Sequence, residues 1–211
     1  MTILALEFSS ARRSVALARG GILLAEAVEQ TGGRGTDVFG LIGRALETGN
    51  VSREEIEVIA VALGPGSYAG IRAAIAVALG WQLARGVKLL GVSSMDSLAA
   101  QAQAEKLFGR VNIAVDAQRG EFYLSVWEIS GQSCAEISAL KIAPAAEIAA
   151  RQAAQEICVG PELERVLFPS AATVAVLAAG RADFVSGDRL EPVYLRETSF
   201  VKAPAGRMGM L

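Results

Sequence analysis

The sequence predicts an α/β protein with mixed β-sheets flanked by helices, arranged as two related lobes. Strand-like runs on either side of Gly20-Gly21 are typical of a tight antiparallel hairpin. Strand and helix patterns then alternate as far as residue 106, which indicates parallel strands joined by helices. A second hairpin pattern around Gln118 to Gly120 repeats the start of the chain, and 211 residues are enough for two such lobes.

The first lobe is predicted to span residues 1–106. Its helices have clear start signals: Thr36 or Asp37 can cap the first helix after the glycine-rich loop TGGRGTD, and Ser93 or Ser94 can cap the last. Ser52 and Glu55 have the spacing of a capping box. In chain order we expect strands at 2–8, 14–19 and 22–30, a helix to about 48, a strand at 56–63, a helix at 68–85, a strand at 87–94 and a helix at 95–106.

The second lobe is predicted to span residues 107–211. The stretch RVNIAVDAQRGEFYLSVWEI forms two strands around its turn, and EICVG forms a short strand. The stretches PAAEIAARQAA and PSAATVAVLAAGRA are predicted helices with proline near the first turn. The end of the chain, VKAPAGRMGML, is predicted to be a loose tail.

The composition excludes several kinds of chemistry. The sequence contains no histidine, so Ser-His-Asp and Cys-His mechanisms and His-based zinc sites are excluded. A net charge of −2 argues against a protein that holds nucleic acid unaided. Cys134 and Cys158 fit buried thiols in a reducing compartment. The start of the chain does not look like a secretory signal and no apolar run reaches the ~20 residues of a membrane span, so a cytoplasmic protein is expected.

The stretch VALGPGSYAGIR places a glycine-rich turn between a strand and a helix. Such a turn can bind an anion, because backbone amides and the helix dipole converge there. No lysine occurs before Lys88, which excludes a Walker A loop, and Gly64, Gly66 and Gly70 are spaced one residue too far for a dinucleotide fingerprint. Two interpretations stay open: a phosphate site, or a turn in which Ser67 caps the helix.

Between Ala69 and Gly80, small residues are spread around the circumference of the helix after this turn, with Ile71, Ile75, Val77 and Leu79 between them. A helix of this kind must be covered on all sides. The cover can come from another chain or from the domain itself, and the sequence leaves both alternatives open.

Four stretches together resemble the TsaB family, also called YeaZ. They are GPGSYAGIR from Gly64, GVSSMDSLA from Gly91, VDAQRGEFY from Val115 and EPVYLR from Glu191, and they occur in the family's order over most of the chain. The resemblance implies two ribonuclease H-like lobes of the acetate and sugar kinase, Hsp70 and actin type. It also implies a noncatalytic subunit of the complex that makes N6-threonylcarbamoyladenosine beside the tRNA anticodon.

The resemblance implies partners rather than an activity of the chain alone. The expected partners are a TsaD-like catalytic subunit and a TsaE-like ATPase, with tRNA bound only within the complex, and a homodimer is the alternative when the chain is alone. TsaD-like proteins hold their metal with histidines on a helix, so this chain cannot be the catalytic subunit. Arg119, Arg165, Arg189 and Arg196 are candidates for contacts with RNA phosphates, with solvated surface charge as the alternative.

The resemblance also implies a vestigial nucleotide site and a docking surface. No catalytic residue, metal or cofactor of its own is expected, beyond weak Mg-ATP binding; the stretch EFSS stands where the family generally has Asp-Thr-Ser. A rival interpretation is a small ATPase or phosphotransferase that uses the same site. The expected site residues are Glu7, Ser9, Ser10, Gly64, Gly66, Ser67 and Asp116. The expected partner interface is Val38, Leu41, Ile42, Ala45, Leu46, Ile71, Ala74 and Ala78, where Ala74→Arg is predicted to abolish partner binding and spare the fold.

Overall fold

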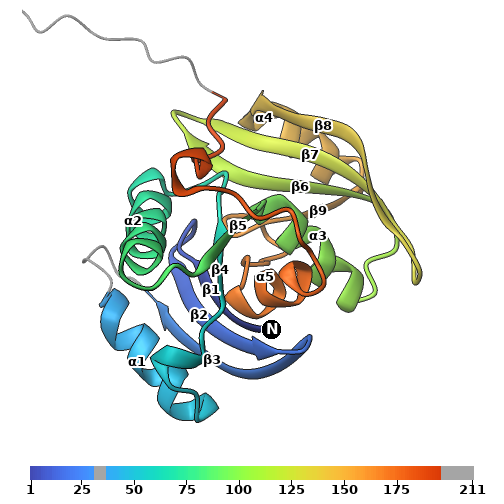
Figure 1. The fold of residues 1–211 in the computed structure, drawn as a ribbon. Helices are drawn as coiled ribbons and strands as arrows, with labels where there is room; N and C mark the ends of the chain where they lie inside the picture. Colours follow the sequence, from blue (N-terminus) through green and yellow to red (C-terminus); the bar gives the residue numbers. More distant parts are fainter. Residues whose placement is uncertain (31–36, 196–211) are drawn as a thin grey trace, which may run out of the picture.

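The computed structural model describes residues 1–30 and 37–195. Two lobes, each built on one β-sheet, lie against each other (Figure 1). The predicted α/β fold with mixed sheets flanked by helices is confirmed. The predicted tail and most of the glycine-rich loop before the first helix lie outside the described residues.

The first sheet has five strands in the order β3-β2-β1-β4-β5. The hairpin strand β1 pairs antiparallel with β2 and parallel with β4, which is the predicted change from hairpin to parallel strands. Every residue of β1 and β4 is buried, as expected for strands covered on both faces. The strands are β1 Thr2–Glu7, β2 Arg12–Arg19, β3 Ile22–Gln30, β4 Val58–Ala62 and β5 Lys88–Val92.

The second sheet has four strands in the order β8-β7-β6-β9. It repeats the first, because β6 pairs antiparallel with β7 and parallel with the short β9. The edge strand β8 is not in the prediction; most of its side chains are exposed, so its sequence has no apolar run to mark it. The strands are β6 Gly109–Gln118, β7 Glu121–Ile129, β8 Cys134–Pro144 and β9 Ile157–Val159.

Five α-helices cover the two sheets (Figure 1). Asp37, one of the two predicted caps, accepts a hydrogen bond from the Gly40 amide at the start of the first helix. Ser93 caps α3 in the same manner. The helices are α1 Val38–Gly49, α2 Tyr68–Arg85, α3 Ser94–Ala104, α4 Ala145–Ala153 and α5 Ala171–Ala178, with 3-10 turns at Arg53–Glu55 and Gly187–Arg189.

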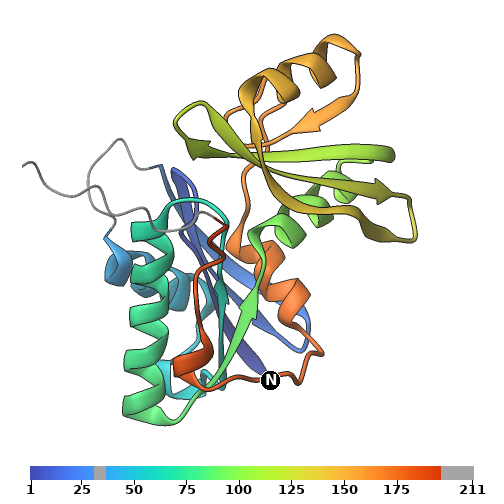
Figure 2. The ribbon, with the colours of Figure 1, turned by 90° about the horizontal axis from the view of Figure 1, so that it is seen from above.

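Two helices, α3 and α5, each pack on the sheet of the other half of the chain (Figure 2). α1 and α2 pack on one face of the first sheet, and α5, which lies late in the chain, packs on its other face. α3, which follows the first sheet, packs instead on the second sheet. Where the two crossing helices meet, the Ser170 amide donates to the Ser97 hydroxyl at 3.2 Å. The division of the chain at residues 106/107 stays a prediction.

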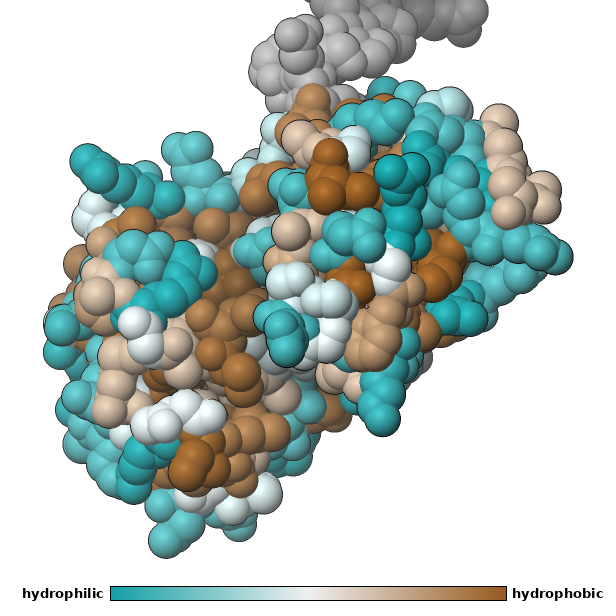
Figure 3. Space-filling view, turned by 90° about the vertical axis from the view of Figure 1, so that its right-hand side faces the viewer, coloured by the Kyte–Doolittle hydropathy of each residue, from teal (hydrophilic) through white to brown (hydrophobic). Residues whose placement is uncertain are grey.

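The seam between the lobes carries a hollow of about 310 Å³ beside α3 and α5, lined by Val92, Trp127 and Leu177 among others. Apolar and polar side chains are interspersed on the face of the molecule that Figure 3 shows. Within residues 1–30 and 37–195, no helix is long and apolar enough to cross a membrane.

Candidate functional site

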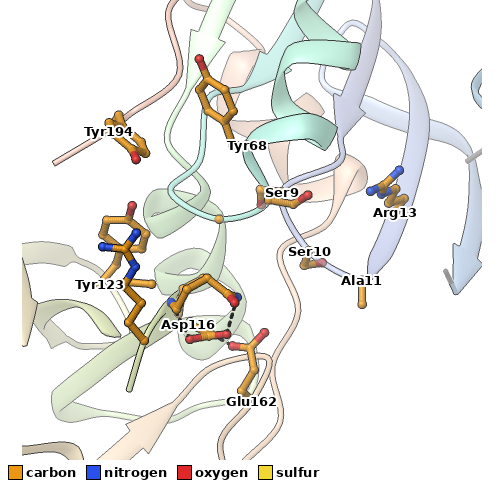
Figure 4. A pocket seen from close by; sticks show the side chains of 15 residues that line it. Ser9, Ser10, Ala11, Arg13, Tyr68, Asp116, Tyr123, Glu162 and Tyr194 are labelled. Atoms are coloured by element: carbon orange, nitrogen blue, oxygen red, sulfur yellow. Dashed lines mark hydrogen bonds between the residues drawn. The ribbon is translucent and has the colours of Figure 1, made fainter. Parts of the chain in front are cut away.

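The largest hollow of the described chain is a cleft of about 610 Å³ between the two lobes. Five segments line it: the β1–β2 turn with the start of β2, the glycine turn with the start of α2, the end of β6 with the start of β7, the loop after β9, and the segment that carries Tyr194 (Figure 4). Five of the predicted site residues come together here: Ser9, Ser10, Gly66, Ser67 and Asp116.

The glycine turn is pressed against the β1–β2 turn. A Cβ atom at Gly66 would clash with the Ser9 carbonyl oxygen, and one at Gly70 would clash with the Phe8 carbonyl oxygen. The Ser67 amide donates to the Ser9 carbonyl at 2.6 Å, and the Gly70 amide donates to the Ser67 hydroxyl at 3.3 Å. These glycines therefore allow two backbone segments to touch, and the amides of Ser67 and Gly70 are used inside the chain.

Gly64 lies outside the lining of the cleft. Its φ of +87° suits glycine, and its carbonyl oxygen accepts a hydrogen bond from the Ser94 amide at 2.8 Å. Gly64 therefore joins the turn to the start of α3.

Glu7 is completely buried below the cleft. Its Oε1 accepts from the Ser9 amide at 2.6 Å, and its Oε2 accepts from the Ser94 hydroxyl at 2.9 Å. Burial raises the pKa of Glu7, and the hydrogen bonds from Ser9 and Ser94 oppose that rise. The carboxylate therefore joins β1 to α3 and is not presented to a ligand.

Asp116 lies near the end of β6 on the opposite lobe and lines the cleft. Its carboxylate accepts from the Gln118 amide at 2.8 Å and from the Gln118 side-chain amide at 2.7 Å. Its own backbone amide donates to Glu162 Oε2 at 3.2 Å (Figure 4). Burial, with a smaller effect of the Asp116 charge, raises the pKa of Glu162.

These groups do not fit a magnesium-bound triphosphate. The loop amides of Ser9, Ser67 and Gly70 already donate within the chain, so they cannot also hold a phosphate. Asp116 and Glu162 bring negative charge to the lining of the cleft, and Arg13 and Arg119 bring positive charge to it. Among the residues that the structure describes, no three His, Cys, Asp or Glu side chains form a metal-binding cluster.

Aromatic residues of the cleft are missing from the prediction. The chain has three tyrosines, and all of them, Tyr68, Tyr123 and Tyr194, line this cleft. Each lies in one of the stretches GPGSYAGIR, VDAQRGEFY and EPVYLR. The stretches that resemble the family therefore contain all three tyrosines, but only the fold shows that these stretches meet. Glu162 is also missing from the prediction, and its flanking sequence carries no signal.

The predicted partner interface stays a prediction, but most of the side chains named for it lie inside the folded chain. Seven of its residues form the core between the first sheet and its helices, and Val38 is half-buried: the seven are Leu41, Ile42, Ala45, Leu46, Ile71, Ala74 and Ala78. Helical spacing finds the apolar stripe of a helix but does not say which surface covers it. Since Ala74 is fully buried, Ala74→Arg would disrupt the fold itself.

The opposite face of the same helices carries a groove of about 220 Å³. Phe39, Trp81 and Ala84 are among the residues that line it, with Arg53, Glu54 and Arg85 at its polar side. Phe39 on α1 is 70% exposed, and Leu83 on α2 is 88% exposed. This outer face of α1 and α2 is therefore an apolar surface that the described part of the chain leaves open.

Comparison with known proteins agrees with this fold. Residues 36–186 match the family model described as TsaD: tRNA N6-adenosine threonylcarbamoyltransferase. The chain is 30% identical over 128 residues to tRNA threonylcarbamoyladenosine biosynthesis protein TsaB of Escherichia coli (strain K12), covering 61% of this chain and 55% of that protein. It is 29% identical over 131 residues to the TsaB protein of Bacillus subtilis (strain 168), covering 61% and 56%. The chain thus spans a little over half the length of these relatives.

Two solved structures from Pseudomonas aeruginosa share the architecture. One is a crystal structure of an uncharacterized protein with similarity to peptidase YeaZ, with a TM-score of 0.78 and 27% identity, covering 92% of this chain and 99% of that one. The other, YeaZ, has a TM-score of 0.75 and 24% identity with the same coverage, and it bears on the fold alone. Since the family model matches well over half of its residues, the chain belongs to the family of tRNA N6-adenosine threonylcarbamoyltransferase proteins, in its TsaB (YeaZ) group.

Proposed function

We propose that this chain is a noncatalytic subunit of the assembly that makes threonylcarbamoyladenosine on tRNA, and that it binds and activates a TsaD-like catalytic subunit. The names of its relatives support the pathway. In this proposal a TsaE-like ATPase and tRNA bind to the assembled complex, and the chain pairs with a second copy of itself when the catalytic subunit is absent. The observation that carries the proposal is the open outer face of α1 and α2.

No contact within the described part of the chain requires glycine at two positions on this face. A Cβ atom at Gly43 or Gly80 would meet nothing within 4 Å. Glycine in a helix interior costs about 1 kcal/mol relative to alanine. Both residues are therefore explained by a surface outside the chain that approaches the helix backbone closely.

The rest of the face has the make-up of a helix-docking surface. Small side chains follow the open side of α2 at helical spacing, at Ala69, Ala73, Ala76, Gly80 and Ala84. The exposed Phe39 and Leu83 flank them and supply large apolar area. An apolar centre with charged groups at its edge is typical of a protein interface. We expect a helix of the partner to lie along α2.

Size-exclusion chromatography with light scattering tests this proposal, using the chain and the TsaD-like protein of the same organism. The expected result is a mixed assembly that replaces the free proteins. Gly80→Arg should keep the fold, because its side chain projects into open space, and should abolish the assembly. Val176→Arg is the matched control, since Val176 is 52% exposed on α5.

Two outcomes contradict the proposal. If Gly80→Arg assembles as well as the unaltered chain, α2 is not the docking surface. If the unaltered chain and the TsaD-like protein elute separately, the proposed partnership fails for this protein. A homodimer of the chain alone that Gly80→Arg dissociates would support the proposed pairing with a second copy through the same face.

A further inference from the structure

We infer that the mouth of the interlobe cleft is a stacking site for an unpaired RNA nucleotide, whose base lies on the ring of Tyr194 beside Tyr68. This inference rests on the proposed function, because it assigns a contact with RNA to the subunit. It concerns the aromatic rim of the cleft and not the loops that would hold the phosphates of a mononucleotide.

The two rings are fixed and open at the same time. Tyr68 is 50% exposed and Tyr194 is 49% exposed. Their ring centroids lie 5.7 Å apart and their planes are inclined by 51°, so a planar base stacks on one ring and not on both. Tyr68 is the first residue of α2, directly after the Ser67 cap. The segment that carries Tyr194 is held by a hydrogen bond from the Val193 amide to the Leu63 carbonyl at 2.8 Å. A base can therefore stack on a ring that is already positioned.

Arginine side chains accompany the rings. The Arg72 guanidinium lies 5.4 Å from the centroid of the Tyr68 ring. Arg119 lies at the exposed β6–β7 turn and lines the cleft. Neither forms an ion pair with any carboxylate in the described part of the chain. Tyrosine rings beside guanidinium groups are a common surface for single-stranded RNA, because rings stack bases and guanidiniums contact phosphates.

The charges favour one orientation of the nucleotide. Asp116 and Glu162 lie together on the wall that the second lobe contributes (Figure 4). Carboxylates repel phosphates but accept hydrogen bonds from the amino groups of bases. A nucleotide that enters with its base toward the carboxylates and its phosphate toward Arg72 or Arg119 keeps the phosphate away from the carboxylates. The same orientation lets the carboxylates accept hydrogen bonds from the base. A nucleoside triphosphate held by the loops of Ser9 and Gly66 would need the opposite arrangement.

Fluorescence anisotropy with the full chain tests the inference. The probe is a labelled oligoadenylate of about eight nucleotides, at about 50 mM salt, and its control is an abasic strand of the same length. The oligoadenylate should bind saturably at submillimolar concentration and the abasic strand should bind more weakly. Tyr194→Ala should weaken binding by about fivefold or more, the loss of one base stack, whereas Tyr194→Phe, which keeps the ring, should stay within about twofold of the unaltered chain.

Three outcomes would overturn the inference. Equal binding of oligoadenylate and abasic strand, or no binding of either, means that no base stacks here. If millimolar ATP displaces the probe, and if Tyr194→Phe loses as much probe binding as Tyr194→Ala, the cleft is assigned to a mononucleotide. Loss of the TsaD-like partner in Tyr194→Ala, with oligoadenylate binding intact, makes the rings a protein contact. The chromatography with Gly80→Arg contains no RNA, so failure of the proposed function is seen separately.

Discussion

Glu7 and Asp116 occupy the same place in the two lobes and differ in what they do. Glu7 ends β1 and Asp116 lies two residues before the end of β6, and each accepts a hydrogen bond from the backbone amide two residues later, at 2.6 Å for Glu7 and 2.8 Å for Asp116. Glu7 is fully buried and also binds the Ser94 hydroxyl. Asp116 is only partly buried and lines the cleft. An identical local pattern therefore gives a structural group in one lobe and an accessible group in the other.

The difference comes from the neighbouring segments. In the first lobe β4 pairs with β1 as far as Leu6, and the glycine turn after β4 closes over the strand end. In the second lobe β9 is short and pairs with β6 only at Val111 to Ile113, so the end of β6 stays open. The length of the adjacent parallel strand and the turn at its end thus decide whether the carboxylate is buried.

Glu7→Ala should cause the largest change. The substitution leaves the Ser9 amide and the Ser94 hydroxyl without their acceptor in a buried place and opens a cavity. We expect a loss of about 3 kcal/mol in the free energy of unfolding. Urea unfolding followed by circular dichroism measures it. A loss below about 1 kcal/mol would mean that the site tolerates buried donors without an acceptor. The difference in structural role between Glu7 and Asp116 would then disappear.

Gly66→Ala should have the next largest effect. Its φ of +146° and the clash of a Cβ atom with the Ser9 carbonyl force the two turns apart. We expect a loss of about 2 kcal/mol in the free energy of unfolding. Gly80→Ala is the control, because open space surrounds Gly80, and alanine there should stabilise the helix by up to about 1 kcal/mol. Equal stability of the two variants would contradict the close contact of the turns.

Glu7→Gln should isolate the contribution of Glu7 to the pH dependence of the free energy of unfolding. The pKa of Glu7 in the folded chain is raised above the ordinary value of 4.5, so the folded state binds this proton more tightly than the unfolded state. The resulting stability is complete below pH 4.5 and is lost as the pH rises through the folded pKa. Glu7→Gln stays neutral and should therefore gain stability relative to the unaltered chain above this pH, by at most about 1.4 kcal/mol per pH unit. Parallel pH profiles would show that Glu7 does not carry the shift.

Asp116→Ala should have the smallest effect on stability. Its carboxylate accepts two hydrogen bonds from the neighbouring Gln118 and lines the cleft. We expect a change of less than about 1 kcal/mol in the free energy of unfolding by urea. A loss as large as that of Glu7→Ala would show that both strand ends are structural.

Most of the fold could be predicted from the sequence because local signals marked its elements. Gly20-Gly21 marked the first hairpin, and the Ser67 and Ser93 caps marked α2 and α3. The strand β8 could not be predicted, because an exposed edge strand has no apolar pattern. The exchange of α3 and α5 between the sheets could not be predicted either, since apolar stripes do not specify which sheet they cover.

The candidate site divides in the same way. The sequence by itself determined which chemistries are excluded, through the absence of histidine, and its resemblance to a known family grouped Ser9, Gly66 and Asp116 into one expected site. Tertiary structure alone decided that Glu7 is buried, that Leu41 and Ala74 face inward and that three distant tyrosines share one cleft. The physical reason is that burial and exposure arise from contacts between segments far apart in the chain, which no local pattern of residues encodes.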